Sequence, residues 1–95
     1  MTRYHKVTTR QFKKDLRRLE KSGFVLSKLQ SIIDALASNK ALPERCRDHE
    51  LKSELKGIRE CHIAPDWLLT YKKDNDKLIL LLLRTGTHRD VLGVE

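Results

Sequence analysis

Four residues in the second half of the chain carry side chains that can exchange protons near neutral pH. They are His49 in the segment CRDHE, His62 in RECHIA, Asp66 beside a proline, and His88 in RTGTHRD. Histidine changes its charge between pH 5 and 8, so it suits general acid and base roles. A lone histidine or a turn aspartate is usually structural, and only their meeting in one place would indicate a reaction site.

The chemistry that suits this set is cleavage of RNA. An RNA strand brings its own nucleophile, the 2′-hydroxyl, and its cleavage needs a base, an acid and cations for the charge that builds on the phosphate. The sequence has no nucleophile elbow, no glycine-rich phosphate loop and no His-Glu-x-x-His motif. Histidines, an aspartate and arginines on a basic chain meet those needs without a metal or cofactor.

The second half of the sequence predicts three strands that would position these residues. Residues 57–64 alternate, residues 67–73 form a second strand after a Pro-Asp turn, and DND at 74–76 is typical of a hairpin turn. Residues 77–84, KLILLLLR, are apolar on both faces, which favours a central, covered strand. Antiparallel order then brings several strand ends to one edge of the sheet. The residues expected to meet there are His62, Asp66, Trp67, Arg84 and His88, with His49 close by.

The first half predicts a strand and two helices. A strand is expected over residues 3–7, and Thr8 and Gln11 fit a Thr-x-x-Gln capping box that opens a helix. Gly23 ends that helix, and a second helix is expected over residues 25–38. The buried stripes of the two helices are Phe12, Leu16 and Leu19, then Leu29, Ile32, Ile33 and Leu36.

The element order β-α-α-β-β-β predicts an α+β fold. Two helices would cover one face of a small, mostly antiparallel sheet and leave the other face available. The 95 residues are expected to form a single domain, 1–95. The tail is expected to be a loop with one helical turn near residues 90–92.

The charge balance favours an anionic partner. Lys and Arg number 20 against 13 Asp and Glu, a net charge of +7, and such an excess on a small domain indicates nucleic acid. Opposite the apolar face of the first helix lies a basic stripe, made of Arg10, Lys13, Lys14, Arg17 and Lys21. The stripe is either a solvated face or a surface that follows phosphates. In the second case Lys13, Lys14 and Arg17 would bind substrate.

A cytoplasmic location is expected from two absences. The first residues, MTRYHKVTT, lack the apolar region of a signal peptide, and LILLLL at 78–83 is too short to cross a bilayer. Cys46 and Cys61 do not form a metal motif by spacing and are expected to be reduced packing thiols.

Two long segments, DHELKSELKGIRECHIAPDWLLTYK and LLRTGTHRDVLG, together resemble the YafQ family of toxins within the RelE superfamily of toxin–antitoxin systems. The joint pattern is Asp-His, then Arg-x-x-His-x-x-x-Asp-Trp, then Arg-Thr-Gly-Thr-His. The resemblance implies a RelE-like fold and a ribosome-dependent mRNA endonuclease that cuts A-site codons and inhibits translation. It also implies a cognate antitoxin as partner and no cofactor.

The resemblance also implies roles for single residues. Positions matching catalytic or near-catalytic residues of the family are His49, His62, Asp66 and His88, and basic positions suited to holding phosphate are Arg59 and Arg84. Trp67 is expected to touch substrate or anchor the turn on the core. The chain departs from the family pattern at Ser53, where a glycine is expected, and at Leu92, where an aromatic residue is common.

The division of labour in catalysis is a separate expectation. His88 lies on a Thr-Gly-Thr loop from which it would reach the leaving oxygen, so it is assigned as the general acid. Asp66, or His49 acting with it, is the candidate base, and His62 would orient them or stabilise charge.

Two other functions stay open on the sequence alone. A non-enzymatic nucleic-acid- or ribosome-binding module would use the basic stripe and leave the histidines incidental. A metal hydrolase would use His49, His62, Asp66 and His88 as ligands, although their spacing matches no helical zinc motif. Loss of cleavage in histidine variants that still bind would exclude the first, and a chelator would identify the second.

Overall fold

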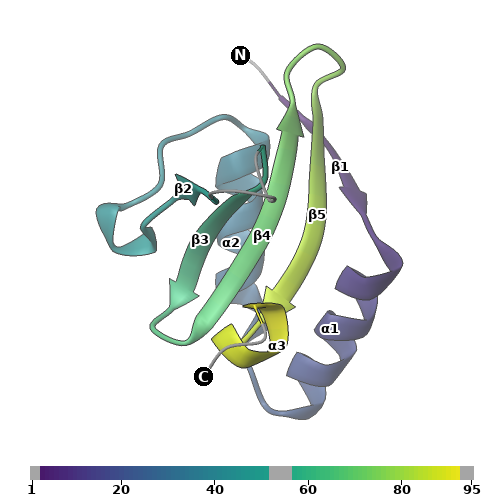
Figure 1. Cartoon of the computed structure of the whole chain (residues 1–95), viewed down its shortest axis with the longest axis vertical. Coiled ribbons are helices and arrows are strands. Elements are labelled where there is room, and N and C mark those ends of the chain that lie inside the picture. Colours follow the sequence, from purple (N-terminus) through teal and green to yellow (C-terminus); the bar gives the residue numbers. More distant parts are fainter. Residues whose placement is uncertain (1–2, 52–56, 93–95) are drawn as a thin grey trace.

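The structure, a computed structural model, describes residues 3–51 and 57–92 of the chain (Figure 1). Its fold is α+β, as the sequence predicts. The elements in chain order are β1 (His5–Thr8), α1 (Arg10–Lys21), α2 (Leu26–Ala37), the 3-10 turn η1 (Glu44–Cys46), β2 (His49–Glu50), β3 (Arg59–Ala64), β4 (Trp67–Asp74), β5 (Ile79–Gly86) and α3 (His88–Leu92).

The five strands form one sheet in the order β1-β5-β4-β3-β2. β1 pairs parallel with β5, and the other three pairs are antiparallel. The apolar segment expected to be central is β5, which has a neighbour on each side, while β4 is the middle strand. α1 contacts β5 from one face of the sheet and α3 from the other, and this explains why the side chains on both faces of β5 are apolar.

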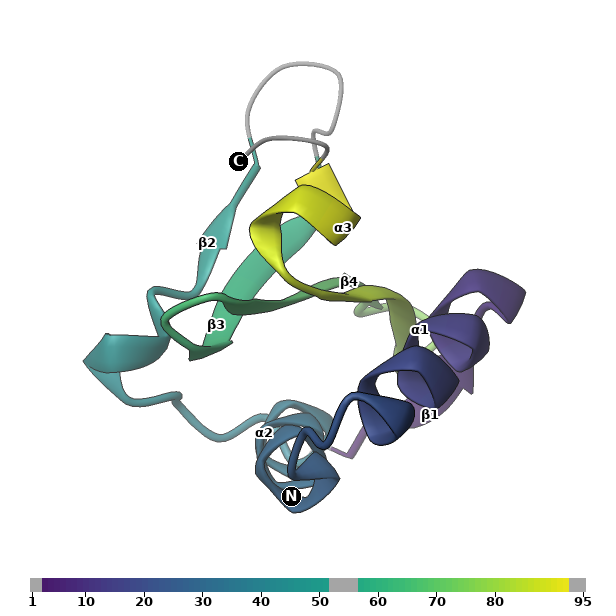
Figure 2. The ribbon, with the colours of Figure 1, turned by 90° about the horizontal axis from the view of Figure 1, so that it is seen from below.

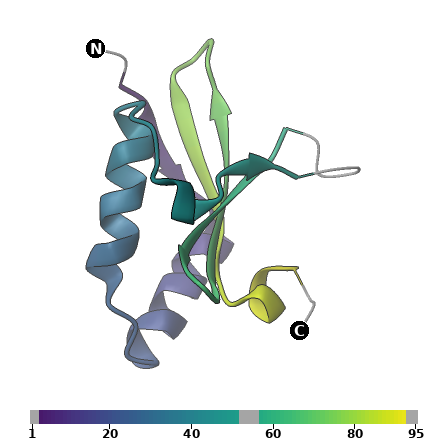
Figure 3. The ribbon, with the colours of Figure 1, turned by 90° about the vertical axis from the view of Figure 1, so that its left-hand side faces the viewer.

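α1 and α2 pack on one face of the sheet, and α3 lies on the other (Figures 2 and 3). α1 contacts β5 and α2 contacts β3. Between helices and sheet lies the core, in which Phe12, Leu19, Leu29, Leu36, Leu69, Tyr71, Leu80 and Leu82 are buried. The two predicted helical stripes are confirmed as the faces that pack on the sheet, with Leu16 and Ile32 at their partly buried margins.

The predicted N-terminal cap of α1 is wrong by one residue. The cap is Thr9, whose side-chain oxygen accepts a hydrogen bond from the Phe12 amide at 3.0 Å. Thr8 is still in β1, because its backbone pairs with Leu82 in the parallel register. Gln11 therefore makes no capping box and donates to Asp15 instead, at 3.2 Å. Gly23, with φ of +84°, follows the helix end as predicted.

Two segments expected to be loops contain regular structure. The segment before β3 forms η1 and the two-residue strand β2, which is too short to show periodicity in sequence. The Thr-Gly-Thr segment is not a flexible loop, since β5 runs to Gly86 and α3 begins at His88. Thr87 and Asp90 close the start of α3 with reciprocal hydrogen bonds of 3.3 and 3.2 Å between side chains and amides.

Cys46 and Cys61 are both free and buried, in agreement with their predicted packing role. Burial raises the pKa of the Cys61 thiol, so this side chain remains protonated at neutral pH. Among the residues that the structure describes, no helix has the length and apolar character needed to cross a membrane.

Candidate active site

The side chains of Asp66 and His88 form a direct pair at the face of the sheet where α3 lies. Asp66 is in the β3–β4 turn, and His88 is the first residue of α3. One carboxylate oxygen of Asp66 accepts hydrogen bonds from both the Nδ1 atom, at 2.7 Å, and the backbone amide, at 3.1 Å, of His88. These bonds lower the pKa of Asp66, the contact with the His88 ring contributing most. An ionised carboxylate can only accept hydrogen bonds, so Nδ1 of His88 carries a proton. Nε2 of His88 is then left for a contact other than Asp66.

His62 lies beside this pair. Its ring centroid is 5.5 Å from that of His88, and its strand position alternates with core residues, so its side chain projects on the face opposite α1 and α2. The Nδ1 atom of His62 is buried and has no hydrogen-bond partner among the described residues. An unsatisfied buried nitrogen costs free energy and is uncommon, which marks His62 as a residue held for something other than stability.

Glu60 is a site residue that the sequence analysis missed. It lies two residues before His62 on the same side of β3 and is only 5% exposed. Its carboxylate is 3.5 Å from Nε2 of His49, which β2 places beside it. The His49 Nδ1 atom donates to the backbone carbonyl of Arg47 at 2.5 Å. The signal available in the sequence was a glutamate two residues before His62 in an alternating strand, which places both side chains on the same face.

The structure therefore brings together three of the expected residues, His62, Asp66 and His88, and adds His49 through Glu60. This order of contacts runs from β2 across β3 to the start of α3. It needs antiparallel pairing of β3 with β2 and β4, which places His49 opposite Glu60 and His62 opposite Leu68.

Arg59 differs from the expectation that it faces the substrate. It precedes Glu60 in β3 and so projects on the other side of the strand. Its guanidinium donates to Asp48 at 3.2 Å, and the hydroxyl of Tyr71 also donates to Asp48. The pKa of Arg59 is raised, mostly by the hydrogen bond with Tyr71 and next by the hydrogen bond with Asp48. This set ties the segment between η1 and β2 to β3 and β4.

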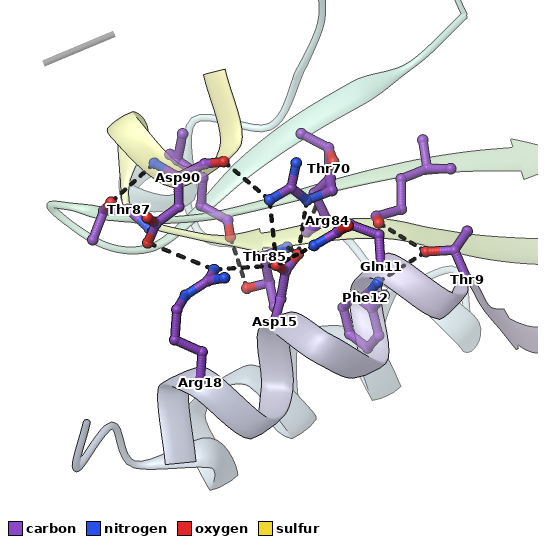
Figure 4. A network of polar contacts seen from close by, with 12 residues as sticks. Thr9, Gln11, Phe12, Asp15, Arg18, Thr70, Arg84, Thr85, Thr87 and Asp90 are labelled. Atoms are coloured by element: carbon purple, nitrogen blue, oxygen red, sulfur yellow. Dashed lines mark hydrogen bonds and ion pairs between the residues drawn. The ribbon is translucent and has the colours of Figure 1, made fainter. Parts of the chain in front are cut away.

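The guanidinium of Arg84 is also bound within the protein, so it is not free to hold a substrate phosphate. Its Nε and Nη2 atoms donate to the two carboxylate oxygens of Asp15, at 2.9 and 3.3 Å, and Nη2 also donates to the carbonyl of Asp90 at 3.0 Å (Figure 4). Asp15 is fully buried, and it accepts further bonds from the Thr85 amide and from Arg18. Burial alone would raise the pKa of Asp15, but the bonds from Arg84, Thr85 and Gln11 outweigh it and lower that pKa.

This network around Asp15 fixes the segment that carries His88. Arg18 contacts both Asp15 and the Asp90 carboxylate, at 3.1 and 3.6 Å, so α1 and α3 are joined across the end of β5 (Figure 4). Gly86 lies between them with φ of +152°, and a Cβ atom there would come within 3.0 Å of Arg18 and Asp90. The glycine of Arg-Thr-Gly-Thr-His is thus required by close packing and by backbone conformation.

Trp67 is a core residue and cannot stack on a substrate. It is 3% exposed, and its ring packs edge-on against Phe24 with centroids 5.0 Å apart. Its indole N–H donates to the Thr85 hydroxyl at 3.0 Å, which anchors the turn beside Asp66 on β5. The alternative given by the sequence, an anchor for the turn, is the one that the structure supports.

The basic stripe of α1 is exposed, as predicted, at Arg10, Lys13, Lys14, Arg17 and Lys21. It is not part of the histidine cluster, because α1 and α3 lie on opposite faces of the sheet (Figure 2). Of the two positions that depart from the family pattern, Ser53 lies outside the described residues and Leu92 ends α3.

Three site residues have the chemistry of a metal-binding group. One ligand atom each from Glu60, His62 and His88 lie within 4.8 Å of one another. Two imidazoles and a carboxylate are a donor set that zinc and copper accept. Ligands bound at about 2.1 Å can be no more than about 4.2 Å apart, so a separation near the upper limit would have to shorten. The residues present therefore fit a metal ion with a small contraction.

Comparisons with known proteins agree with one another. The family model described as a bacterial toxin of type II toxin–antitoxin system, YafQ, matches residues 4–93. The mRNA interferase toxin YafQ of Escherichia coli is 42% identical over 84 residues, which is 87% of this chain and 89% of that protein. A chain in the crystal structure of the Escherichia coli DinJ–YafQ toxin–antitoxin complex superposes with a TM-score of 0.87 at 33% identity, covering 96% of this chain and 99% of that one. A metal-bound toxin from Helicobacter pylori superposes with a TM-score of 0.86 at 38% identity, over 94% of this chain and 98% of that one.

Proposed function

The chain belongs to the YafQ family of bacterial toxins of type II toxin–antitoxin systems, and we propose that it is an endoribonuclease that cleaves mRNA held in the ribosomal A site. The observation that carries the proposal is the Asp66–His88 pair beside His62 on the accessible face of the sheet. A pair of this kind holds an imidazole in one tautomer with its second nitrogen directed at a substrate. The identity to the mRNA interferase toxin of Escherichia coli supports the substrate class.

His88 acts as the general acid. Asp66 holds the Nδ1 proton of His88, so Nε2 is the atom that protonates the leaving 5′-oxygen. The lowered pKa of Asp66 makes this carboxylate a poor base near neutral pH. Asp66 therefore orients His88 as the proton donor. The sequence-based prediction for the base was Asp66, or His49 acting with it. The proposed role of Asp66 differs from this prediction, because its contact with His88 could not be derived from residue types.

His49 is the better candidate for the general base. Its Nδ1 donates to the Arg47 carbonyl, so the neutral ring has its lone pair on Nε2, and this atom can take the proton of the 2′-hydroxyl. Glu60 lies 3.5 Å from the same nitrogen and would stabilise the imidazolium that forms. His62 lies between the base His49 and the acid His88, and in this mechanism it faces the charge that builds on the phosphate.

The proposed partners are a cognate antitoxin and the ribosome. The antitoxin follows from family membership and from the similarity to a chain of a toxin–antitoxin complex. The ribosome is supported by the site itself, since Trp67 is buried and no Trp, Tyr or Phe in the described part of the chain is exposed beside the histidine cluster to hold bare RNA. A cytoplasmic location is part of the same proposal.

The test is single-turnover cleavage of mRNA with defined chemistry at the cut. We expect cleavage to be far faster on ribosomes than in free solution, and the products to end in a 2′,3′-cyclic phosphate or its opened 3′-phosphate. A substrate with a 2′-O-methyl group at the cut should be inert, because the nucleophile is blocked. Binding without any cleavage would instead favour a non-enzymatic ribosome-binding protein. Equal rates on free RNA would reject ribosome dependence alone.

A metal-dependent nuclease is the second candidate, since Glu60, His62 and His88 fit a metal ion. When bound, the ion would supply a water activated for attack or a Lewis acid for the phosphate. This mechanism does not need the RNA hydroxyl. Cleavage of the 2′-O-methyl substrate, products with 3′-hydroxyl ends, and loss of activity with a chelator would together replace the metal-independent mechanism.

A further inference from the structure

A pocket of about 510 Å³ opens at the edge of the sheet next to the candidate active site. β2 pairs only with Arg59 and Glu60, so within the described residues, 3–51 and 57–92, the second half of β3 has no strand beside it on that edge. The space is bounded by α2, by η1 and by the end of β3. Its lining residues are Lys28, Arg45, Arg47 and residues 62–65.

The charge of this pocket is of one sign. Among the residues that the structure describes, its lining has three cations, Lys28, Arg45 and Arg47, and no carboxylate. Within residues 3–51 and 57–92, none of the three has an ion pair, whereas Arg59 and Arg84 each contact an aspartate within 3.2 Å. Like charges that converge on one space repel one another until an anion enters. The pocket is thus prepared for an anionic ligand.

The pocket shares His62 with the catalytic cluster. On one side of His62 lies His88 at the start of α3, which contacts β4 and β5. On the other side lies the pocket, and η1 contacts β3 there. Figure 1 shows the same arrangement, with η1 beyond the outer edge of β3 and α3 toward β5. A strand whose scissile phosphate lies beside His62 and His88 would therefore continue into the pocket.

We propose that this pocket binds the backbone phosphate of a nucleotide adjacent to the cleaved bond, through Lys28, Arg45 and Arg47. The inference rests on the proposed RNA-cleaving function and adds a substrate-binding surface to it. The volume is within the range of about 300–1,000 Å³ that is typical of small-ligand sites and admits a nucleotide unit. Guanidinium groups bind phosphate oxygens with two parallel hydrogen bonds. Such contacts position RNA without reading its sequence.

The experiment combines one change in the RNA with one in the protein. Synthetic mRNAs carry a single uncharged methylphosphonate at each of the phosphates flanking the cut, and cleavage on ribosomes is measured over a range of protein concentrations. The variant is K28Q/R45Q. Arg47 is left in place because its backbone lies in the left-handed region, with φ of 48°. K40Q/K77Q is the matched control, since both lysines are exposed and removal of the same charge there lies away from the pocket.

We expect one methylphosphonate position to raise the half-saturating concentration of the wild-type protein about tenfold, the loss of roughly one charged contact. K28Q/R45Q should show a similar increase with unmodified mRNA and almost no further increase with that methylphosphonate, because both changes remove the same contact. K40Q/K77Q should behave as the wild type in both respects. The cut position should stay the same throughout.

Three results would overturn the inference while leaving the proposed function intact. In one, K28Q/R45Q saturates with unmodified mRNA like K40Q/K77Q. In another, the effects of the variant and of every methylphosphonate are additive. Weaker antitoxin binding by K28Q/R45Q with unchanged RNA saturation would also overturn it and assign the pocket to an acidic protein segment. Absence of cleavage by the wild-type protein would be a failure of the proposed function itself.

Discussion

Asp15 and Asp66 both bind basic side chains near the C-terminal end of β5, but in opposite ways. Asp15 is fully buried and accepts hydrogen bonds from Arg84, Arg18, Gln11 and the Thr85 amide. The side chain of Asp66 is 68% exposed, and both of its bonds come from His88. The hydrogen-bond acceptor sites of Asp15 are filled by groups of the folded protein, and Asp15 is in this sense saturated. Asp66 instead orients one imidazole that solvent or substrate can reach.

The difference separates a structural group from a group placed for chemistry. A buried carboxylate is stable only when its acceptor sites are filled, so the Asp15 network joins α1, β5 and α3. The neighbouring histidine cluster has ring nitrogens that can still form hydrogen bonds. Nε2 of His88 does not contact Asp66, and Nδ1 of His62 has no partner among the described residues. The saturated region holds His88 in position, and the unsaturated region can exchange protons.

The largest expected effect is on the cleavage rate, and it comes from a change in the histidine cluster. H88A should lower the single-turnover rate of mRNA cleavage by about 10²–10⁴-fold, because it removes the proton donor of the leaving group. Ribosome and antitoxin binding should stay close to wild type. H5A, which changes an exposed histidine in β1, is the matched control and should cleave normally. A rate for H88A within threefold of wild type would remove His88 from the mechanism.

On the saturated side, D15N should act through stability. An amide cannot satisfy Arg84 and Arg18 as a carboxylate does, so we expect the free energy of unfolding to fall by about 3 kcal/mol. D66N should leave the denaturant midpoint unchanged, because that side chain is exposed, while it lowers the cleavage rate. Chemical denaturation and cleavage assays of both variants check this contrast. A stable D15N protein or an unfolded D66N protein would contradict the proposed division.

The buried Asp15 network also predicts how stability depends on pH. The pKa of Asp15 in the folded protein lies below the ordinary value of about 3.9. Its contribution is therefore fully present above that value and is lost as the pH falls through the folded-state pKa. Unfolding measured from pH 6 to pH 2 should show stability falling below about pH 4. D15N should show a smaller acid-induced fall than the wild type, and an equal fall would disprove the assignment.

The smallest effect is expected at the basic stripe, whose side chains are exposed on α1 while that of Asp15 on the same helix is buried. K13E/K14E/R17E should weaken ribosome association and make it less sensitive to salt, because fewer counterions are released on binding. The fold should be retained, since these side chains are exposed on α1. K40E/K77E serves as the control for charge reversal elsewhere. Unchanged ribosome binding and toxicity would show that the stripe is a solvated face.

Local patterns determined much of this structure and part of its site. The apolar periodicity of α1 and α2, the Pro-Asp turn and the hairpin signal each depend on neighbouring residues. They predicted the order β1, α1, α2, β3, β4 and β5 and the face that α1 and α2 cover, but not β2. They also predicted that His62, Asp66 and His88 would meet, because antiparallel strands joined by short turns have their ends at one edge.

Tertiary structure alone decided which groups are saturated. Asp15 and Arg84 are 69 residues apart in sequence, and no local pattern shows that they meet. The burial of Trp67, the pairing of Arg59 with Asp48, the contact of Glu60 with His49 and the cations gathered around the pocket likewise depend on contacts between separate segments. Residue type and spacing determine which face a side chain occupies. Whether its polar groups remain available to bind a substrate depends on every neighbour that folding brings to it.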